Sequence, residues 1–164
     1  MSLPYYIVNA FTDLPFGGNP AAVMPLDQWL PDHQLQALAA QHNLSETAFF
    51  VPVAPSTFEL RWFTPVEEVP LCGHATLASA HVLLREMQVS GDALSFQTRY
   101  RGLLHAQPQG DRLALDLPAV EYEPHKVEAG LEAALGARVV SAVRPCEEPW
   151  QVLYELESEQ SVRA

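Results

Sequence analysis

Residues 73–87, GHATLASAHVLLREM, constrain the fold of this chain more than any other stretch. The first three turns of the helix predicted here carry apolar or small residues on nearly every side, and the polar pair Arg85–Glu86 comes only at its end. A helix that is apolar all round is buried. Its many alanine, serine and glycine residues would let surrounding backbone come close. We therefore expect strands wrapped around a central helix.

The segments on both sides of this helix have the patterns that such strands need. Short apolar or alternating runs, bounded by Gly, Pro and Asn, are typical of strands. An amphipathic helix is predicted at LPDHQLQALAAQHN, with Asn43 as its C-terminal cap. The expected strands are 5–11, 21–25, 44–51 and 56–65, and then SFQTRYRGLLHAQ and DRLALDLP. The expected class is α+β, with a mixed or antiparallel sheet around the buried helix.

The chain is expected to divide near Pro118. Residues 1–118 contain the central helix and its strands, and residues 119–164 start again with the helix-like VEAGLEAALG and the strand-like VVSAVR and WQVLYELE. The latter 46 residues are too few to close a second barrel or sandwich at typical domain sizes. We expect a first lobe at 1–118 and the beginning of a second, truncated lobe at 119–164.

Charge and composition exclude several classes of protein. Nine basic and twenty acidic residues give a net charge of −11, and the basic residues are scattered, so a nucleic-acid partner is not expected. No run of about eighteen apolar residues and no signal-like leader occurs, which predicts a cytoplasmic protein with no membrane partner. Cys72 and Cys146 lack C-x-x-C spacing, and no H-x-x-x-H pair occurs, so neither a disulfide framework nor a metal site is predicted.

The segment NLSETAFFVPV places a carboxylate where a strand should be apolar. If residues 44–51 are extended, Glu46 shares a face with Leu44, Ala48 and Phe50. Burying an isolated carboxylate is costly. Two interpretations remain open: a strand-end carboxylate that reaches solvent, or a functional acid–base group in a dry cleft.

The segment LCGHAT lies where the central helix begins. Backbone N–H groups at a helix N-terminus bind anions, and Gly73 would let a ligand carboxylate approach them. The same position lowers the pKa of a thiol, which makes Cys72 a candidate reactive group. The alternatives are that Cys72 is a small buried apolar residue, Gly73 a turn residue and His74 a structural hydrogen-bonding group.

Three ordered segments, NAFTDLPFGGNPAAV, NLSETAFF and LRWFTPVEEVPLCGHATLASA, strongly resemble the N-terminal half of the phenazine-biosynthesis PhzF-like isomerase family, relatives of diaminopimelate epimerase. The resemblance implies two pseudo-symmetric lobes, each with a sheet around a central helix, and an active site between the lobes at the N-termini of both helices. This chain would then form a diaminopimelate epimerase-like lobe with an incomplete second lobe, as a fragment of a longer product or as a natural truncation.

The resemblance also assigns roles to individual residues. Glu46 matches the family's proton-shuttling glutamate, with Ser45 beside it. His74 and Gly73 match the segment in which the histidine helps to hold the substrate and backbone N–H groups receive its carboxylate. Asn19 matches a loop near the cleft. Glu46 and His74 are therefore the predicted catalytic residues.

The implied function is a cofactor-independent isomerase in a biosynthetic process, which moves a proton on a small carboxylated metabolite. Cys72, grouped with the substrate-binding residues, also resembles the first of two thiols in the epimerases of the wider fold, although Cys146 does not resemble the second. A thiol-dependent epimerase or racemase is therefore one alternative, and a half-protein that only binds a ligand or partner is another. We expect a homodimer in which residues 119–164 pack against a neighbouring chain.

Overall fold

A computed structural model describes residues 3–147 and 151–164 of the chain. Backbone contacts divide the chain into two compact units, Met1–Pro118 and Ala119–Ala164. No helix in the described ranges is long and apolar enough to cross a bilayer.

One mixed sheet forms the frame of the first unit. Within the described residues it has eight strands in the order β1-β2-β3-β4-β6-β7-β8, with β5 paired to β4. The pairs β2–β3 and β4–β6 are parallel, and the other pairs are antiparallel. The strands are β1 (Tyr6–Ala10), β2 (Asn19–Pro25), β3 (Glu46–Ala54), β4 (Thr57–Phe63), β5 (Glu68–Val69), β6 (Leu94–Thr98), β7 (Leu103–Gln109) and β8 (Arg112–Asp116).

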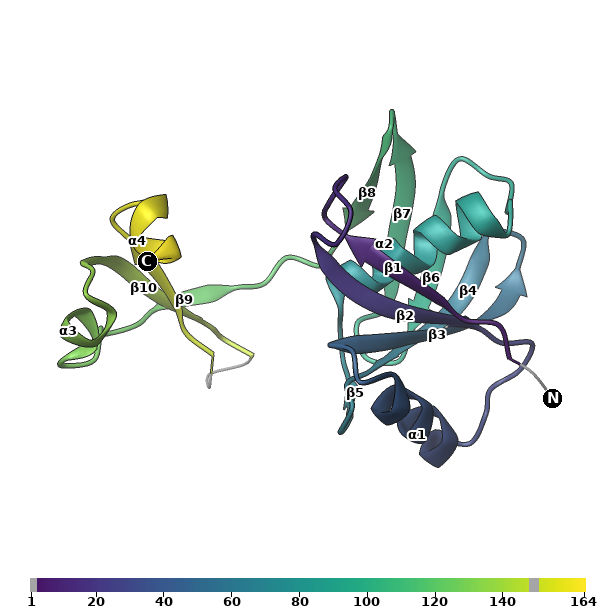
Figure 1. The fold of residues 1–164 in the computed structure, drawn as a ribbon, viewed down its shortest axis with the longest axis horizontal. Coiled ribbons are helices and arrows are strands. Elements are labelled where there is room, and N and C mark those ends of the chain that lie inside the picture. Colours follow the sequence, from purple (N-terminus) through teal and green to yellow (C-terminus); the bar gives the residue numbers. More distant parts are fainter. Residues whose placement is uncertain (1–2, 148–150) are drawn as a thin grey trace. The chain divides into compact units, whose positions relative to one another are not determined.

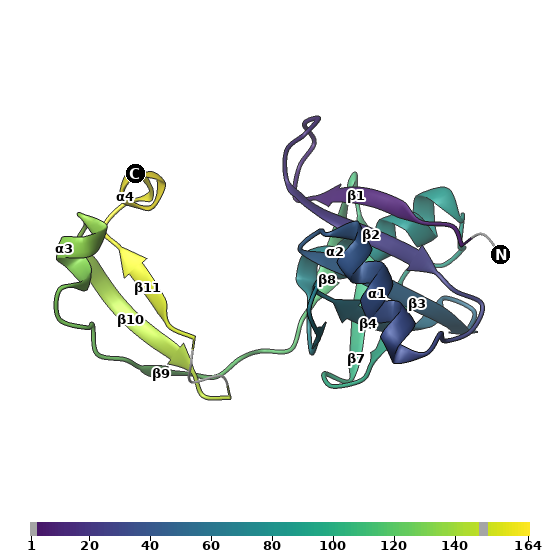
Figure 2. The ribbon, with the colours of Figure 1, turned by 60° about the horizontal axis from the view of Figure 1, so that its bottom comes forward.

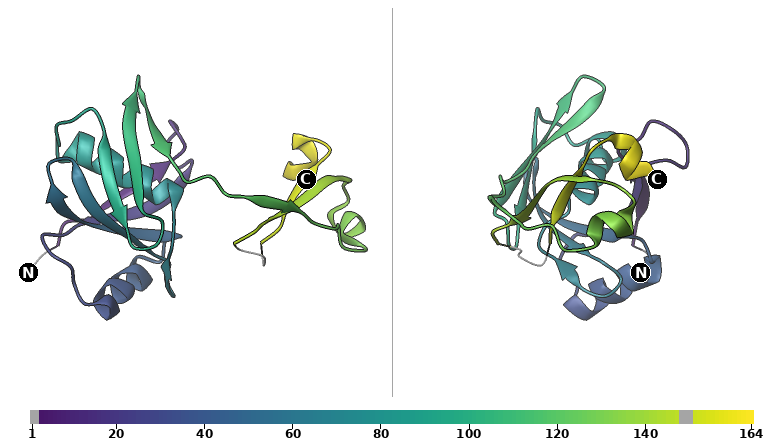
Figure 3. Two further views of the ribbon diagram at one scale, coloured as in Figure 1. Left: turned by 180° about the vertical axis from the view of Figure 1, so that it is seen from behind. Right: turned by 90° about the vertical axis from the view of Figure 1, so that its left-hand side faces the viewer.

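The sheet curls around helix α2 (Gly73–His81), as the sequence predicts (Figures 1 and 3). The helix contacts β1 and β2, at one edge of the sheet, and β8, at the opposite edge. It continues as a wider π-helix, Val82–Glu86, which ends where Gln88 adopts a left-handed conformation with φ 54°. The expected α+β architecture, a sheet wrapped around a buried central helix, is confirmed.

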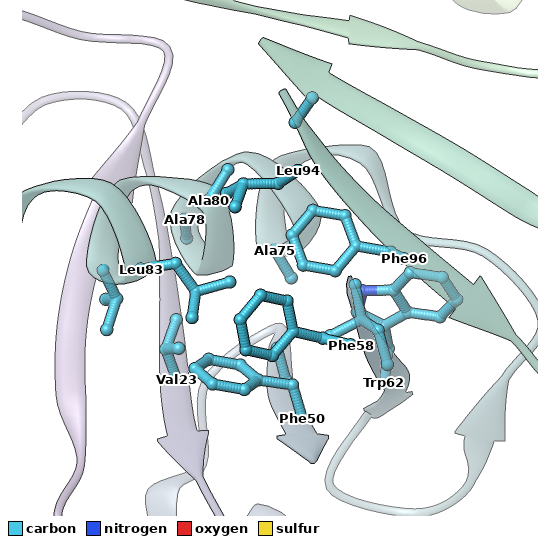
Figure 4. Close-up of a cluster of buried hydrophobic side chains, with 14 of the residues drawn as sticks. Val23, Phe50, Phe58, Trp62, Ala75, Ala78, Ala80, Leu83, Leu94 and Phe96 are labelled. Carbon is cyan, nitrogen blue, oxygen red and sulfur yellow. The ribbon is translucent and has the colours of Figure 1, made fainter. Parts of the chain in front are cut away.

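The main core lies between α2 and the concave face of the sheet (Figure 4). Phe58 stacks edge-on against Phe50 at a centroid distance of 5.4 Å and lies 6.3 Å from Phe96. Ala75 lies close to these rings, and the small side chains of Ala75, Ala78 and Ala80, each at most 1% exposed, allow strands to approach the helix from several sides. Each fully buried large side chain contributes about 1.5–3 kcal/mol, so this cluster is the main stabilising feature of the unit.

A smaller core lies on the convex face of the sheet, under helix α1 (Asp32–His42). Leu35 and Ala39 of α1 are buried there with Phe49 and Phe63. The helix ends at Asn43, which has φ 51° and donates its N–H to the Ala39 carbonyl at 3.1 Å. The predicted helix and its cap are confirmed.

The second unit is a three-stranded antiparallel sheet with two short helices (Figure 2). Its elements are β9 (Tyr122–Pro124), α3 (Leu131–Leu135), β10 (Val139–Pro145), β11 (Leu153–Leu156) and α4 (Glu159–Arg163). Only the second half of VEAGLEAALG is helical, because Gly130 takes φ 86° and forms the N-cap. The predicted strand WQVLYELE is confirmed from Leu153, and its Trp150 lies outside the described residues. Among the described residues of this unit, the buried apolar side chains are Val139, Ala142 and Pro145, so its core is small.

Candidate functional site

Glu46 and His74 meet on the concave side of the sheet although they are far apart in sequence. Glu46 is the first residue of β3 and His74 the second residue of α2. Glu46 Oε2 lies 3.3 Å from His74 Nε2, and Cys72 Sγ lies 3.3 Å from Nδ1 of the same ring. The two predicted catalytic residues and one predicted binding residue therefore form one cluster.

The strand register explains the place of the carboxylate. Glu46 pairs with Ala21 of β2, and its face continues through Ala48 and Phe50, which are 0% and 1% exposed. The Glu46 side chain is 21% exposed, so it stands at the border between this core and solvent. It is a strand-end carboxylate, as one interpretation of the sequence holds, but it is directed to His74 on the buried helix.

Two polar atoms of this cluster lack a hydrogen bond. Glu46 Oε2 and His74 Nε2 are both buried, and neither has a hydrogen-bond partner among the described residues. Their separation of 3.3 Å is close enough for an ion pair, but the angles are not those of a hydrogen bond. Native proteins satisfy nearly all buried polar atoms, and exceptions need an explanation such as a catalytic or binding role.

Cys72 is the N-cap of α2, with φ −146° and ψ 114°. Burial raises the pKa of its thiol to about 12, and the nearby Glu46 carboxylate adds to the rise. Backbone N–H groups of Ala75 and His74 hydrogen-bond to the sulfur and oppose this shift without cancelling it. The expectation that the helix terminus lowers the pKa of Cys72 is therefore wrong, because desolvation outweighs the terminus. The thiol is protonated at neutral pH.

The remaining predicted residues lie around this cluster. Ser45 Oγ donates to Asn19 Oδ1 at 3.4 Å, which joins the start of β2 to the residue before β3. A Cβ atom added to Gly73 would have Leu117 Cδ1, at 3.9 Å, as its one neighbour within 4 Å in the described chain. The space beside the Gly73 backbone is therefore open to a ligand. The roles of Asn19, Ser45 and Gly73 in substrate binding stay predictions.

Two further residues lie on the elements that surround the cluster. Trp62 lies on β4 opposite Ala48, on the same face of the sheet as Glu46, and its buried indole N–H also lacks a hydrogen-bond partner. Thr76 donates its hydroxyl to the Cys72 carbonyl at 2.6 Å and so fixes the start of α2. Alternation in sequence places Trp62 on the buried face, but no sequence pattern shows that its N–H stays unpaired.

Glu46, Cys72 and His74 are the described residues able to share a metal ion, since one ligand atom of each lies within 4.8 Å of the others. A carboxylate beside an imidazole at a helix N-terminus can move protons and hold an anion. Two surface cavities, of about 510 Å³ beside Gly136 and about 390 Å³ beside Arg61, do not include these side chains.

Comparison with known proteins assigns this arrangement to a family. Residues 8–164 match the family described as phenazine biosynthesis-like protein. An uncharacterized isomerase from Pseudomonas aeruginosa is 52% identical over 136 residues, which cover 83% of this chain and 52% of that protein. A second uncharacterized isomerase of that organism is 44% identical over all of this chain and 61% of its own length. A phenazine biosynthesis-like domain-containing protein from Mus musculus is 46% identical, over 88% of this chain and 53% of its own.

Solved structures show the same fold. A PhzF family protein from Enterococcus faecalis superposes with a TM-score of 0.87 and 41% identity, over 99% of this chain and 60% of that one. A predicted epimerase from Pseudomonas aeruginosa superposes with a TM-score of 0.62 and 25% identity, over 79% of this chain and 47% of that one. The fold is therefore diaminopimelate epimerase-like, as expected. The chain spans 52–61% of the length of the curated relatives described above.

Proposed function

Because the chain belongs to the phenazine biosynthesis-like protein family, whose relatives include proteins named as isomerases, we propose that it carries the acid–base site of a cofactor-independent isomerase. The substrate class is a small carboxylated metabolite. Glu46 is the proton-transferring group and His74 holds and orients the substrate beside it.

One observation carries this proposal. Glu46 Oε2 and His74 Nε2 face each other at 3.3 Å, buried and without hydrogen bonds, at the N-terminus of α2. Leaving such atoms unpaired costs about 1–3 kcal/mol each, which a substrate that pairs with them would offset. The backbone N–H groups of the helix start can receive the substrate carboxylate, and the open space at Gly73 allows it to approach.

The reaction needs one carboxylate. Glu46 takes a proton from one carbon of the substrate, the electron pair of that C–H bond shifts the adjacent double bond, and Glu46 returns the proton to another carbon on the same face. Atoms and electrons balance, because the product is an isomer of the substrate. No group outside the chain is required for this proton transfer.

Proton exchange tests the proposal. The chain is incubated in deuterated buffer with dihydro-hydroxyanthranilate-like acids, and mass spectrometry follows deuterium in the recovered acid. We expect incorporation by the wild type, loss of at least a hundredfold in Glu46→Gln, and a much smaller loss in Cys72→Ala. No exchange by the wild type, under conditions in which a full-length relative exchanges, would refute isomerase activity for this chain.

Two alternatives predict different results. A thiol-dependent epimerase would lose exchange in Cys72→Ala and keep most of it in Glu46→Gln, but the high pKa of Cys72 argues against a thiol base. A binding protein without turnover would bind the acids without exchange. This alternative stays open because the chain spans 52–61% of the length of those relatives.

We also propose a homodimer, because the second unit exposes large apolar side chains over a small core. Those at least 42% exposed in this unit are Val120, Tyr122, Leu135, Val140, Leu153 and Val162. Apolar groups exposed together favour association. Light scattering at micromolar concentration would give the mass of a dimer, and a stable monomer with amides protected from hydrogen exchange throughout residues 119–164 would contradict it. A cytoplasmic location stays a prediction.

A further inference from the structure

Cys72 is a buried thiol that the proposed proton transfer does not use. Its side chain contacts the ring of His74, and the two residues are 7% and 8% exposed. The Cys72 sulfur lies 3.3 Å from Nδ1 of this ring, whereas the other ring nitrogen, Nε2, faces Glu46 Oε2. The thiol therefore meets the histidine at the nitrogen that the carboxylate does not reach.

The start of α2 holds the thiol in this place. The Cys72 carbonyl accepts the Thr76 hydroxyl at 2.6 Å and the Thr76 N–H at 3.3 Å, so residue 72 is tied to the first turn of the helix. Backbone N–H groups of Ala75 and His74 donate to the sulfur. The sulfur is thus an acceptor for the backbone, and its one S–H remains to be donated to a side chain.

The direction of the contact with His74 follows from the state of the thiol. Burial raises the pKa of Cys72 to about 12, so the sulfur carries its hydrogen at neutral pH. A neutral imidazole has one nitrogen that donates and one that accepts, and the bond made by one fixes the state of the other. A thiol that donates to Nδ1 leaves the ring hydrogen on Nε2, where a donor then faces the Glu46 carboxylate.

The Glu46 carboxylate is a second acceptor near the thiol, because after burial it also contributes to the raised pKa of Cys72. A thiol turned to Glu46 would allow Nδ1 to keep a hydrogen, and the ring would then carry a positive charge. The distances favour Nδ1, since the sulfur lies 3.3 Å from it and the buried Glu46 Oε2 has no hydrogen-bond partner among the described residues.

We propose that Cys72 is a positioning residue, whose thiol donates a hydrogen bond to His74 Nδ1 and so holds the ring with an N–H at Nε2. Without the thiol, Nδ1 would be a buried acceptor with no partner, and the ring would lose the contact that fixes its orientation. An N–H at Nε2 is the form of the ring that can donate to a substrate oxygen. The effect on proton transfer rests on the proposed isomerase, whereas the hydrogen bond itself does not.

The S–H stretching band of Cys72 in the infrared spectrum tests the bond without an activity assay. Cys146→Ser removes the other of the two cysteines, so the band that remains belongs to Cys72 and should lie below the frequency of a free thiol. In this background His74→Phe, which keeps a ring but lacks the acceptor, should raise the frequency, and Glu46→Gln should shift it much less. A band that moves with Glu46→Gln and not with His74→Phe would overturn the proposal.

Nitrogen-15 NMR of the wild type determines which ring nitrogen carries the hydrogen. At pH 8 we expect a hydrogen on Nε2 of His74 and none on Nδ1, with the signals assigned through bonds from the backbone of residue 74. Hydrogen on both nitrogens, or on Nδ1 alone, would refute the proposal. This measurement needs no variant, so it remains decisive if circular dichroism shows that His74→Phe is unfolded.

Deuterium exchange separates the positioning role from the proposed isomerase. Cys72→Ala should lower exchange by about three- to tenfold, which is the effect of one neutral hydrogen bond, and Cys72→Ser should recover most of it because serine restores a donor. Equal losses in both variants would contradict the positioning role. If the proposed isomerase fails, the wild type shows no exchange, while the infrared band and the nitrogen signals of His74 are unchanged.

Discussion

A buried arginine joins three elements of the first unit, and its removal should destabilise that unit strongly. Arg61 of β4 is 10% exposed and donates two hydrogen bonds to the 15% exposed Glu68 of β5, at 2.8 and 2.7 Å, and one to Asp32 of α1 at 2.9 Å. Its guanidinium also lies 5.2 Å from the Trp29 ring centroid and 5.1 Å from that of Phe63. Arg61 therefore fixes β5 and α1 to the sheet.

The magnitude follows from what Arg61→Met leaves behind. Removal of one partner from a buried ion pair costs about 3–5 kcal/mol, because the other charge stays buried and unpaired. Glu68 keeps one hydrogen bond, from Arg99 at 2.8 Å, which places the expected loss near the lower end, about 3 kcal/mol. Methionine retains most of the apolar volume, so the loss reports on the charge and its hydrogen bonds.

The loss should depend on pH. Burial by itself raises the pKa of Glu68, but hydrogen bonds and charge from Arg61 and Arg99 outweigh it and hold the pKa below its ordinary value of 4.5. A carboxyl with a lowered folded-state pKa stabilises the fold above its unfolded pKa, and this contribution disappears as the pH falls through the folded pKa. The difference between wild type and Arg61→Met should therefore be complete at pH 7 and should narrow below about pH 4.5.

Urea unfolding followed by circular dichroism measures this difference. Arg85→Met is the control, because Arg85 is exposed in the same unit and its loss should cost no more than about 0.5 kcal/mol. Arg61→Lys should fall between wild type and Arg61→Met, since an ammonium cannot form the two parallel bonds. A loss below about 1 kcal/mol in Arg61→Met, or one that stays constant to pH 3, would refute the reasoning.

Three further predictions concern the site and its supports. Gly18→Ala should cost at least about 1 kcal/mol more than Gly102→Ala in urea unfolding, because both glycines have positive φ, of 74° and 68°, but a Cβ at Gly18 would meet a backbone oxygen at 2.2 Å. Thr76→Val should cost about 1–2 kcal/mol and Thr76→Ser much less, since only valine loses the 2.6 Å bond at the start of α2. Because its pKa is about 12, Cys72 should react with iodoacetamide far more slowly than Cys146 at pH 8. The rate of alkylation of Cys72 should rise about tenfold per pH unit, as peptide mass spectrometry would show. Equal rates for the two cysteines at pH 8 would contradict the burial of the Cys72 thiol.

The central helix could be predicted because its signal is local. Residues 73–87 are apolar on all sides, and only burial inside a wrapped sheet satisfies such a helix. The cap at Asn43 could be predicted for the same reason, because an asparagine directly after the apolar stripe of a helix is a short-range signal for a left-handed C-terminal cap. The two-residue strand β5 is too short to show any alternation, and Arg61 of β4 binds its Glu68 through side-chain hydrogen bonds that no local pattern shows.

The site could be predicted only in part. Sequence alone marks Glu46 as a carboxylate on an apolar face and Cys72–His74 as a helix start, but their meeting depends on the register of β3 and on how α2 lies across the sheet. The error at Cys72 has the same origin. The effect of a helix terminus is visible in the sequence, whereas the burial that outweighs it comes from residues distant along the chain.

The distribution of unpaired polar atoms supports a functional origin of the site. Among the described residues, the buried side-chain atoms without a hydrogen bond are Glu46 Oε2, His74 Nε2 and Trp62 Nε1. All three belong to strands or the helix that enclose the concave side of the sheet, and none lies in the smaller core under α1. Leaving a buried polar atom unpaired costs about 1–3 kcal/mol, so these atoms lower the stability of the unit. Buried polar atoms left without hydrogen bonds on Glu46 and His74, which face each other at the start of α2, are better explained by ligand binding than by folding.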